Sequence, residues 1–156
     1  IHDNSGNLIY RGWMLDFSKF YVLLKNKYRV NKVFLFIGYK AGNENLYTYL
    51  QKIGYILIFK PILISKDGSV VKGNVDADLV LQAMIDFPHY EKAVLVSSDG
   101  DFYSLVRYLS EKGKLLTVIS SDVENCSGLL KQTAGEKMRF MDNLRNKLEY
   151  KRKSTA

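Results

Sequence analysis

The segment Ala93-Val94-Leu95-Val96-Ser97-Ser98-Asp99-Gly100-Asp101-Phe102 decides the fold, because a short apolar run ends there in serines and aspartates. An apolar run of this length is typical of a strand buried on both faces inside a parallel sheet. The residues after it have helical periodicity, which predicts a helix with Asp101 as its N-cap and Gly113 at its end. We therefore expect Asp99 and Asp101 at the carboxyl end of a central strand, where open α/β sheets carry their sites.

Asp99 and Asp101 lie two residues apart, and two carboxylates at this spacing repel each other unless a cation or a proton compensates. One interpretation is half of a divalent-metal site. The other is a helix cap beside a solvated loop acid. The segment alone leaves both open.

Apolar strands alternate with amphipathic helices along the rest of the chain, and the connections are short. The pattern predicts strands at 33–38, 55–59 and 115–120, and helices at 16–24, 44–53 and 75–86. Such alternation is typical of an α/β fold, here a three-layer α/β/α sandwich with a mainly parallel central sheet.

Length and composition predict one compact domain. The chain has 156 residues, of which 47% are apolar. Its one cysteine, Cys126, excludes an internal disulfide and favours the reducing cytoplasm. Neither a membrane-spanning stretch nor a signal-peptide pattern is recognisable, so we expect no membrane partner.

Positive charge is concentrated at the C-terminus. From residue 136 onward, seven Lys and Arg stand against three Asp and Glu, a surplus of four out of a net charge of +7. We therefore divide the chain into a domain at 1–135 and a basic C-terminal helix and tail at 136–156, packed on the same domain. Such a helix could bind phosphate backbones or could simply be a solvated face.

A second acidic pair, Asp76 and Asp78, begins the helix expected at 75–86. At about 100° per residue, the two side chains point to different sides of that helix. Asp76 falls within the apolar arc and Asp78 on the polar one. An acid facing the sheet needs a partner, which makes Asp76 the stronger candidate for a functional role and predicts that Asp78 is the more exposed.

Two ordered motifs, 72–80 (Lys-Gly-Asn-Val-Asp-Ala-Asp-Leu-Val) and 97–102 (Ser-Ser-Asp-Gly-Asp-Phe), resemble the NYN domain of the PIN-like nuclease superfamily, in particular its bacterial LabA-like group. The resemblance implies a PIN-like sandwich and a cytoplasmic ribonuclease that holds Mg²⁺ or Mn²⁺ and hydrolyses phosphodiester bonds of single-stranded RNA. It also implies a site of clustered acids at the carboxyl ends of the strands. The catalytic and metal-binding residues would be Asp3, Asp76, Asp99 and Asp101, with auxiliary roles for Asn7, Lys72, Asp78 and Ser98.

Two positions depart from the family pattern. Ser98 stands where a glycine is usual. In the first motif, spacing from Asn7 places Asn4 at the metal position, whereas Asp3 fills it only if the motif contains an inserted residue. We expect Asp3 to be the ligand, because hard cations favour carboxylate oxygen. Only Ile1 and His2 precede it, so the apolar strand that usually leads into this motif is almost absent from the sequence.

Other classes of protein remain open. The main alternative is a PIN-like module that binds RNA with weak or no catalysis. The Asp-Gly-Asp segment also resembles haloacid-dehalogenase phosphatases, but those carry Thr or Val where this chain has Tyr103. A Toprim domain would need a glutamate at the end of an earlier strand, and none stands there.

Overall fold

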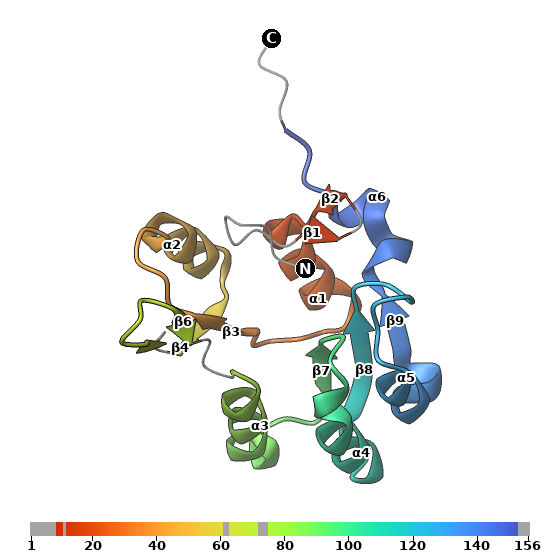
Figure 1. The fold of residues 1–156 in the computed structure, drawn as a ribbon. Helices are drawn as coiled ribbons and strands as arrows, with labels where there is room; N and C mark the ends of the chain where they lie inside the picture. Colours follow the sequence, from red (N-terminus) through yellow and green to blue (C-terminus); the bar gives the residue numbers. More distant parts are fainter. Residues whose placement is uncertain (1–8, 11, 61–62, 72–74, 153–156) are drawn as a thin grey trace. The chain divides into compact units, whose positions relative to one another are not determined.

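The structure is a computed structural model that describes residues 9–10, 12–60, 63–71 and 75–152 (Figure 1). The predicted site residues Asp3, Asn7 and Lys72, and Asn4 with them, lie outside these ranges. The chain forms two compact units, one from residues 1–29 and 91–156 and the other from residues 30–90. We call them the first and the second unit.

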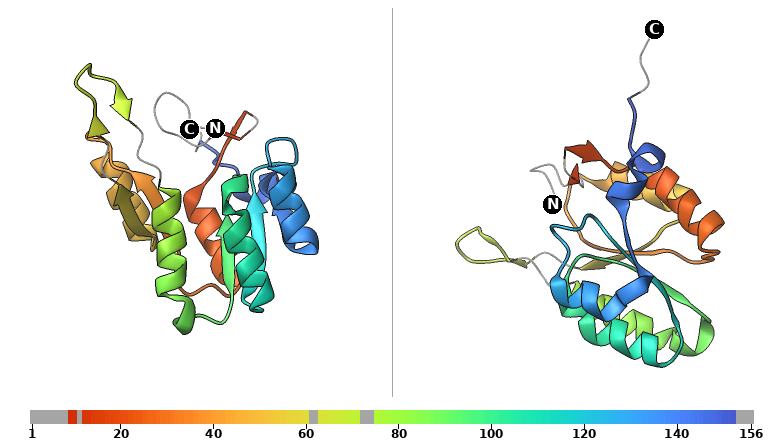
Figure 2. Two further views of the ribbon diagram at one scale, coloured as in Figure 1. Left: turned by 60° about the horizontal axis from the view of Figure 1, so that its bottom comes forward. Right: turned by 90° about the vertical axis from the view of Figure 1, so that its right-hand side faces the viewer.

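A parallel three-stranded sheet forms the middle of the first unit, with strands in the order β7-β8-β9. Helices α1 and α6 lie on one side of this sheet and α4 and α5 on the other (Figure 2). The bounds are β7 (Ala93–Val96), β8 (Leu115–Ser120), β9 (Met138–Phe140), α1 (Phe17–Lys27), α4 (Tyr103–Glu111), α5 (Gly128–Ala134) and α6 (Arg145–Leu148).

The most deeply buried strand of the first unit is β8, where Leu115, Val118 and Ile119 are at most 1% exposed. The apolar faces of α4 and α5 supply further core residues. The sequence predicts burial on both faces for β7, but only Leu95 of that strand is buried and Val96 is 37% exposed. This prediction is therefore wrong for β7 and fits β8, which has a parallel neighbour on each side.

Some helix ends follow local sequence signals and others do not. The Asp16 carboxylate accepts a hydrogen bond from the Lys19 N–H at 3.0 Å and caps α1. Gly113, at φ +67°, follows the end of α4. Asp101, however, is not an N-cap, because it lies inside a 3₁₀ turn (Gly100–Phe102) that precedes α4 and is capped by Asp99.

Only a short part of the basic C-terminal helix and tail expected at 136–156 is helical in the described residues. The segment instead contains strand β9, a 3₁₀ turn (Met141–Leu144) and the short helix α6. Pairing with the buried strand β8 outweighs helix propensity here, since residues 138–140 extend the sheet by one strand. Met141 and Leu148 are each 1% exposed, so the segment also contributes to the core of the first unit.

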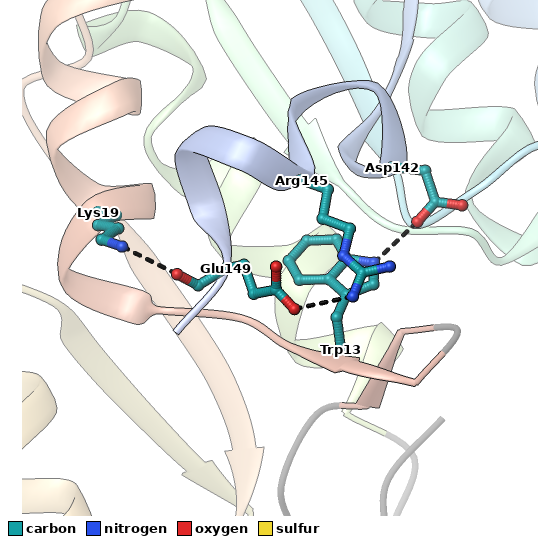
Figure 3. A network of polar contacts seen from close by, with 5 residues as sticks. All are labelled: Trp13, Lys19, Asp142, Arg145 and Glu149. Carbon is teal, nitrogen blue, oxygen red and sulfur yellow. Dashed lines mark hydrogen bonds and ion pairs between the residues drawn. The ribbon is translucent and has the colours of Figure 1, made fainter. Parts of the chain in front are cut away.

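Polar contacts join this C-terminal segment to the N-terminal part of the first unit (Figure 3). The Trp13 indole N–H donates to Asp142 Oδ1 at 2.9 Å, and Lys19 Nζ donates to the Glu149 carbonyl at 2.9 Å. Arg145 pairs with Glu149 at 2.9 Å, which lowers the pKa of the Glu149 carboxyl. Trp13 belongs to a small antiparallel hairpin of strands β1 (Ile9–Tyr10) and β2 (Trp13–Met14).

The second unit contains a parallel pair of strands, β3 and β4, and an antiparallel hairpin, β5 and β6. Helix α2 ends at Gly54, which adopts φ +129°, and packs on β4. The bounds are β3 (Phe34–Gly38), α2 (Glu44–Ile53), β4 (Ile56–Lys60), β5 (Leu63–Ile64), β6 (Val70–Val71) and α3 (Asp76–Ile85).

Parallel strands and helices alternate in both units, so the predicted α/β class is confirmed. Within the described ranges, none of the helices combines the length and the apolar character that crossing a bilayer requires.

Candidate functional site

Asp99 and Asp101 lie together directly after the carboxyl end of β7, as the sequence predicts. The Asp101 N–H donates to Asp99 Oδ1 at 2.8 Å, and the Asp99 N–H donates to the Ser97 hydroxyl at 3.1 Å. Both aspartates are exposed. The first bond fixes one oxygen of Asp99 while both carboxylates remain accessible from solvent.

The predicted auxiliary residue Ser98 is directed into the first unit. Its hydroxyl bonds to the hydroxyls of Ser120 at 2.6 Å and Ser121 at 3.0 Å, and it accepts from the Ser121 N–H at 3.2 Å. Its carbonyl accepts from the Ser127 N–H at 3.1 Å. These bonds tie the carboxyl ends of β7 and β8 together, so Ser98 positions the loop that carries Asp99.

Gly100 separates the two aspartates and allows a close contact. A Cβ added there would stand 2.4 Å from the Ser127 Oγ. Ser127 is the N-cap of α5, and its hydroxyl accepts from the Leu130 N–H at 3.4 Å. The Asp-Gly-Asp segment is therefore held against the first turn of α5.

A further acid, Asp122, was not singled out from the sequence. It follows β8 in a second Ser-Ser-Asp segment (Ser120-Ser121-Asp122) that repeats the segment after β7, and this repetition is the signal that could have found it. Asp122 is 2% exposed and accepts from the Asn125 backbone N–H at 2.9 Å and from its side-chain amide at 2.9 Å. These bonds hold the turn after β8, which is a structural role.

Asp76 and Asp78 lie in the first turn of α3, in the second unit. Carboxylates are favourable there because they complement the helix dipole. Both side chains are half-buried, and the predicted difference in exposure between them stays a prediction. The apolar arc behind that expectation is itself not buried, since α3 has no buried residue among those described.

The exposed carboxylates of Asp99 and Asp101 suit a hard divalent cation such as Mg²⁺ or Mn²⁺, which binds oxygen ligands. Two anionic side chains this close are stabilised by such a cation. Because Asp99 is oriented by the Asp101 N–H, the pair would present its remaining oxygens without further rearrangement. The donor set therefore fits the metal that the sequence predicts.

Comparison with known proteins identifies a family and a solved structure with a similar fold. The family model of the NYN domain matches residues 4–141. A crystal structure of a protein of unknown function from Vibrio parahaemolyticus is similar with a TM-score of 0.74 and 22% identity, over 90% of this chain and 85% of that one. At that identity the likeness concerns the fold alone. None of the curated proteins matches the sequence.

Proposed function

The chain belongs to the NYN domain family, and from that membership we propose that it is a metal-dependent ribonuclease. NYN domains are usually nucleases and generally act on nucleic acids. The observation that carries the proposal is the pair Asp99 and Asp101, which are exposed and joined to each other after β7. Exposed acids at the carboxyl end of a strand are what a metal-dependent nuclease of this family would need.

We further propose that Asp76 joins Asp99 and Asp101 in one metal site. Three carboxylates would supply the oxygen ligands that a hard divalent cation prefers. Asp76 starts its helix, and a parallel α/β fold brings helix starts and strand carboxyl ends to the same edge. Asp3, outside the described residues, would be the fourth acid, and Asn7, Lys72 and Asp78 would have auxiliary roles.

In this account Asp76 and Asp99, with Asp3, would hold one Mg²⁺ or Mn²⁺, and Asp101 would complete a second site or bind through water. When bound, a divalent cation supplies a water of lowered pKa and neutralises charge on the leaving oxygen. The aspartates would hold the cation, and the Asp101 N–H orients Asp99. Neither a serine nor a cysteine nucleophile is needed.

The proposal extends to the LabA-like group and to single-stranded RNA as substrate. The net charge of +7 and the basic residues after position 136 favour a polyanionic partner. An RNA-binding module with weak or no catalysis is the second candidate. It is favoured by Asn4, which the spacing from Asn7 puts at the first metal position, because an amide binds hard cations less well than a carboxylate.

A titration of Mn²⁺ and Mg²⁺ against a labelled single-stranded RNA tests these candidates. Cleavage that requires the metal and stops on chelation supports the nuclease. Binding without cleavage at any metal concentration supports the module and overturns the nuclease. Release of phosphate from small monoesters, with RNA left intact, would indicate a phosphatase instead.

A further inference from the structure

We propose that Tyr39 and Phe59, at the carboxyl ends of β3 and β4, form a platform on which a base of a single-stranded nucleic acid stacks. With Tyr47 beneath them, we call these residues the aromatic platform. It lies wholly in the second unit. The inference rests on the proposed function for the class of ligand, but it requires neither a metal nor cleavage.

The three rings of the aromatic platform contact one another. Phe59 meets Tyr39 edge to face, with centroids 5.8 Å apart and planes at 80°, and meets Tyr47 at 4.8 Å and 70°. Tyr47 is 6% exposed, whereas Tyr39 is 43% and Phe59 is 38% exposed. The buried ring supports two others that reach solvent, which a core cluster alone would not require.

Hydrogen bonds hold the platform in place. The Tyr39 hydroxyl donates to Glu44 Oε1 at 3.1 Å, and the Gly42 N–H donates to Glu44 Oε2 at 2.9 Å. Backbone N–H groups of Glu44 and Gly42 lower the pKa of the Glu44 carboxyl, so this acceptor stays ionised at neutral pH. The Lys40 N–H donates to the Tyr47 hydroxyl at 2.9 Å. Rings fixed before binding lose little entropy when a ligand stacks on them.

The charge around the platform suits a phosphate backbone. Lys40 is exposed beside Tyr39, and Lys60 follows Phe59 and accepts the Tyr39 N–H on its carbonyl at 3.0 Å. Two of the four lysines between residues 30 and 60, Lys40 and Lys60, therefore stand next to platform residues, and the single acid of that stretch is Glu44. Exposed aromatic rings beside positive charge are the combination by which proteins bind single-stranded nucleic acid without sequence preference.

The test measures the affinity of the full chain for a short labelled single-stranded RNA in EDTA, where metal-dependent cleavage cannot occur. Tyr39→Leu keeps an apolar side chain but removes the π-face, so we expect binding about 5- to 100-fold weaker. Tyr39→Phe keeps the ring and loses only the hydrogen bond to Glu44, so its affinity should lie closer to that of the wild type than to that of Tyr39→Leu. The control Tyr49→Leu removes a tyrosine of α2 that is 48% exposed, and should have no effect.

A second measurement guards against a variant that fails to fold. RNA carrying 5-iodouridine is crosslinked to the wild-type protein, and the modified residue is identified by mass spectrometry. Crosslinks at Tyr39 or Phe59 support the platform. Crosslinks confined to other residues, or equal affinity of folded Tyr39→Leu and wild-type protein, overturn it. A third result would also overturn it: Tyr39→Leu differs from the wild type in oligomeric state but not in RNA affinity. The surface would then be an interface between copies of the chain.

The two proposals fail separately. If the protein cleaves RNA with metal but its RNA affinity does not depend on Tyr39, the nuclease is supported and the platform is overturned. If RNA affinity depends on Tyr39 but no cleavage occurs, the platform is supported and the nuclease is overturned.

Discussion

Gly100 lies so close to Ser127 that a Cβ added to the glycine would stand 2.4 Å from the serine Oγ and 3.1 Å from its Cβ. The contact presses the Asp99-Gly100-Asp101 segment against the N-cap of α5. Packing therefore requires glycine at this position, between two aspartates, independently of any role in chemistry.

The substitution Gly100→Ala should lower the free energy of unfolding by about 1–3 kcal/mol, the usual cost of overpacking. Rotating the Ser127 hydroxyl away would relieve only part of the clash, because the serine Cβ would stay too close. Chemical denaturation measures the change. Gly128→Ala is the control, since nothing lies within 4 Å of a Cβ there. Equal stability of Gly100→Ala and wild type would contradict the contact.

Much of the fold could be predicted from the sequence because its signals are local. The strand and helix pattern and the Asp16 cap depend on neighbouring residues. Strand β9 could not be predicted in the same way, because residues 138–140 become a strand only by pairing with β8, which is distant in sequence. The burial of β8 rather than β7 is likewise set by which strand has a parallel neighbour on each side.

For the site, the sequence predicted the place of Asp99 and Asp101 because an apolar run ending in acids marks the end of a strand. It wrongly predicted Asp101 as the cap of the helix that follows. The choice depends on backbone geometry, and the 3₁₀ turn gives that role to Asp99. The bonds of Ser98 to Ser120 and Ser121 were also unpredictable, since they join two strand ends about twenty residues apart.

The first turn of α3 offers a matched pair for testing the proposed site. Asp76→Asn should abolish metal-dependent RNA cleavage, because it removes a proposed ligand, whereas Asp78→Asn should retain most of it. Both variants lose one negative charge from the same helix turn, so their effects on the helix dipole are similar. The measurement is the rate of RNA cleavage by each variant at saturating metal. Equal rates for the two variants would contradict a specific role for Asp76.

The basic C-terminal segment predicts a salt-dependent contribution to RNA binding. Replacing exposed Lys147, Lys151 and Arg152 with Gln should reduce the slope of log affinity against log salt by about 0.7 for each RNA phosphate that the variant no longer neutralises. Arg145→Gln should reduce it less, because Arg145 already pairs with Glu149. Binding is measured in EDTA at several salt concentrations. An unchanged slope in the triple variant would mean that these residues do not contact RNA.

The most direct test of the central claim is the Mn²⁺-dependent cleavage of single-stranded RNA by Asp99→Asn. Asparagine can still accept the hydrogen bond from the Asp101 N–H, and one source of repulsion is removed, so the variant should fold with a Tm in EDTA no lower than wild type. Glu91→Gln, at the other end of β7, is the control for loss of one negative charge. The account predicts cleavage by wild type and Glu91→Gln and none above background by Asp99→Asn. Wild-type cleavage rates in Asp99→Asn would contradict it.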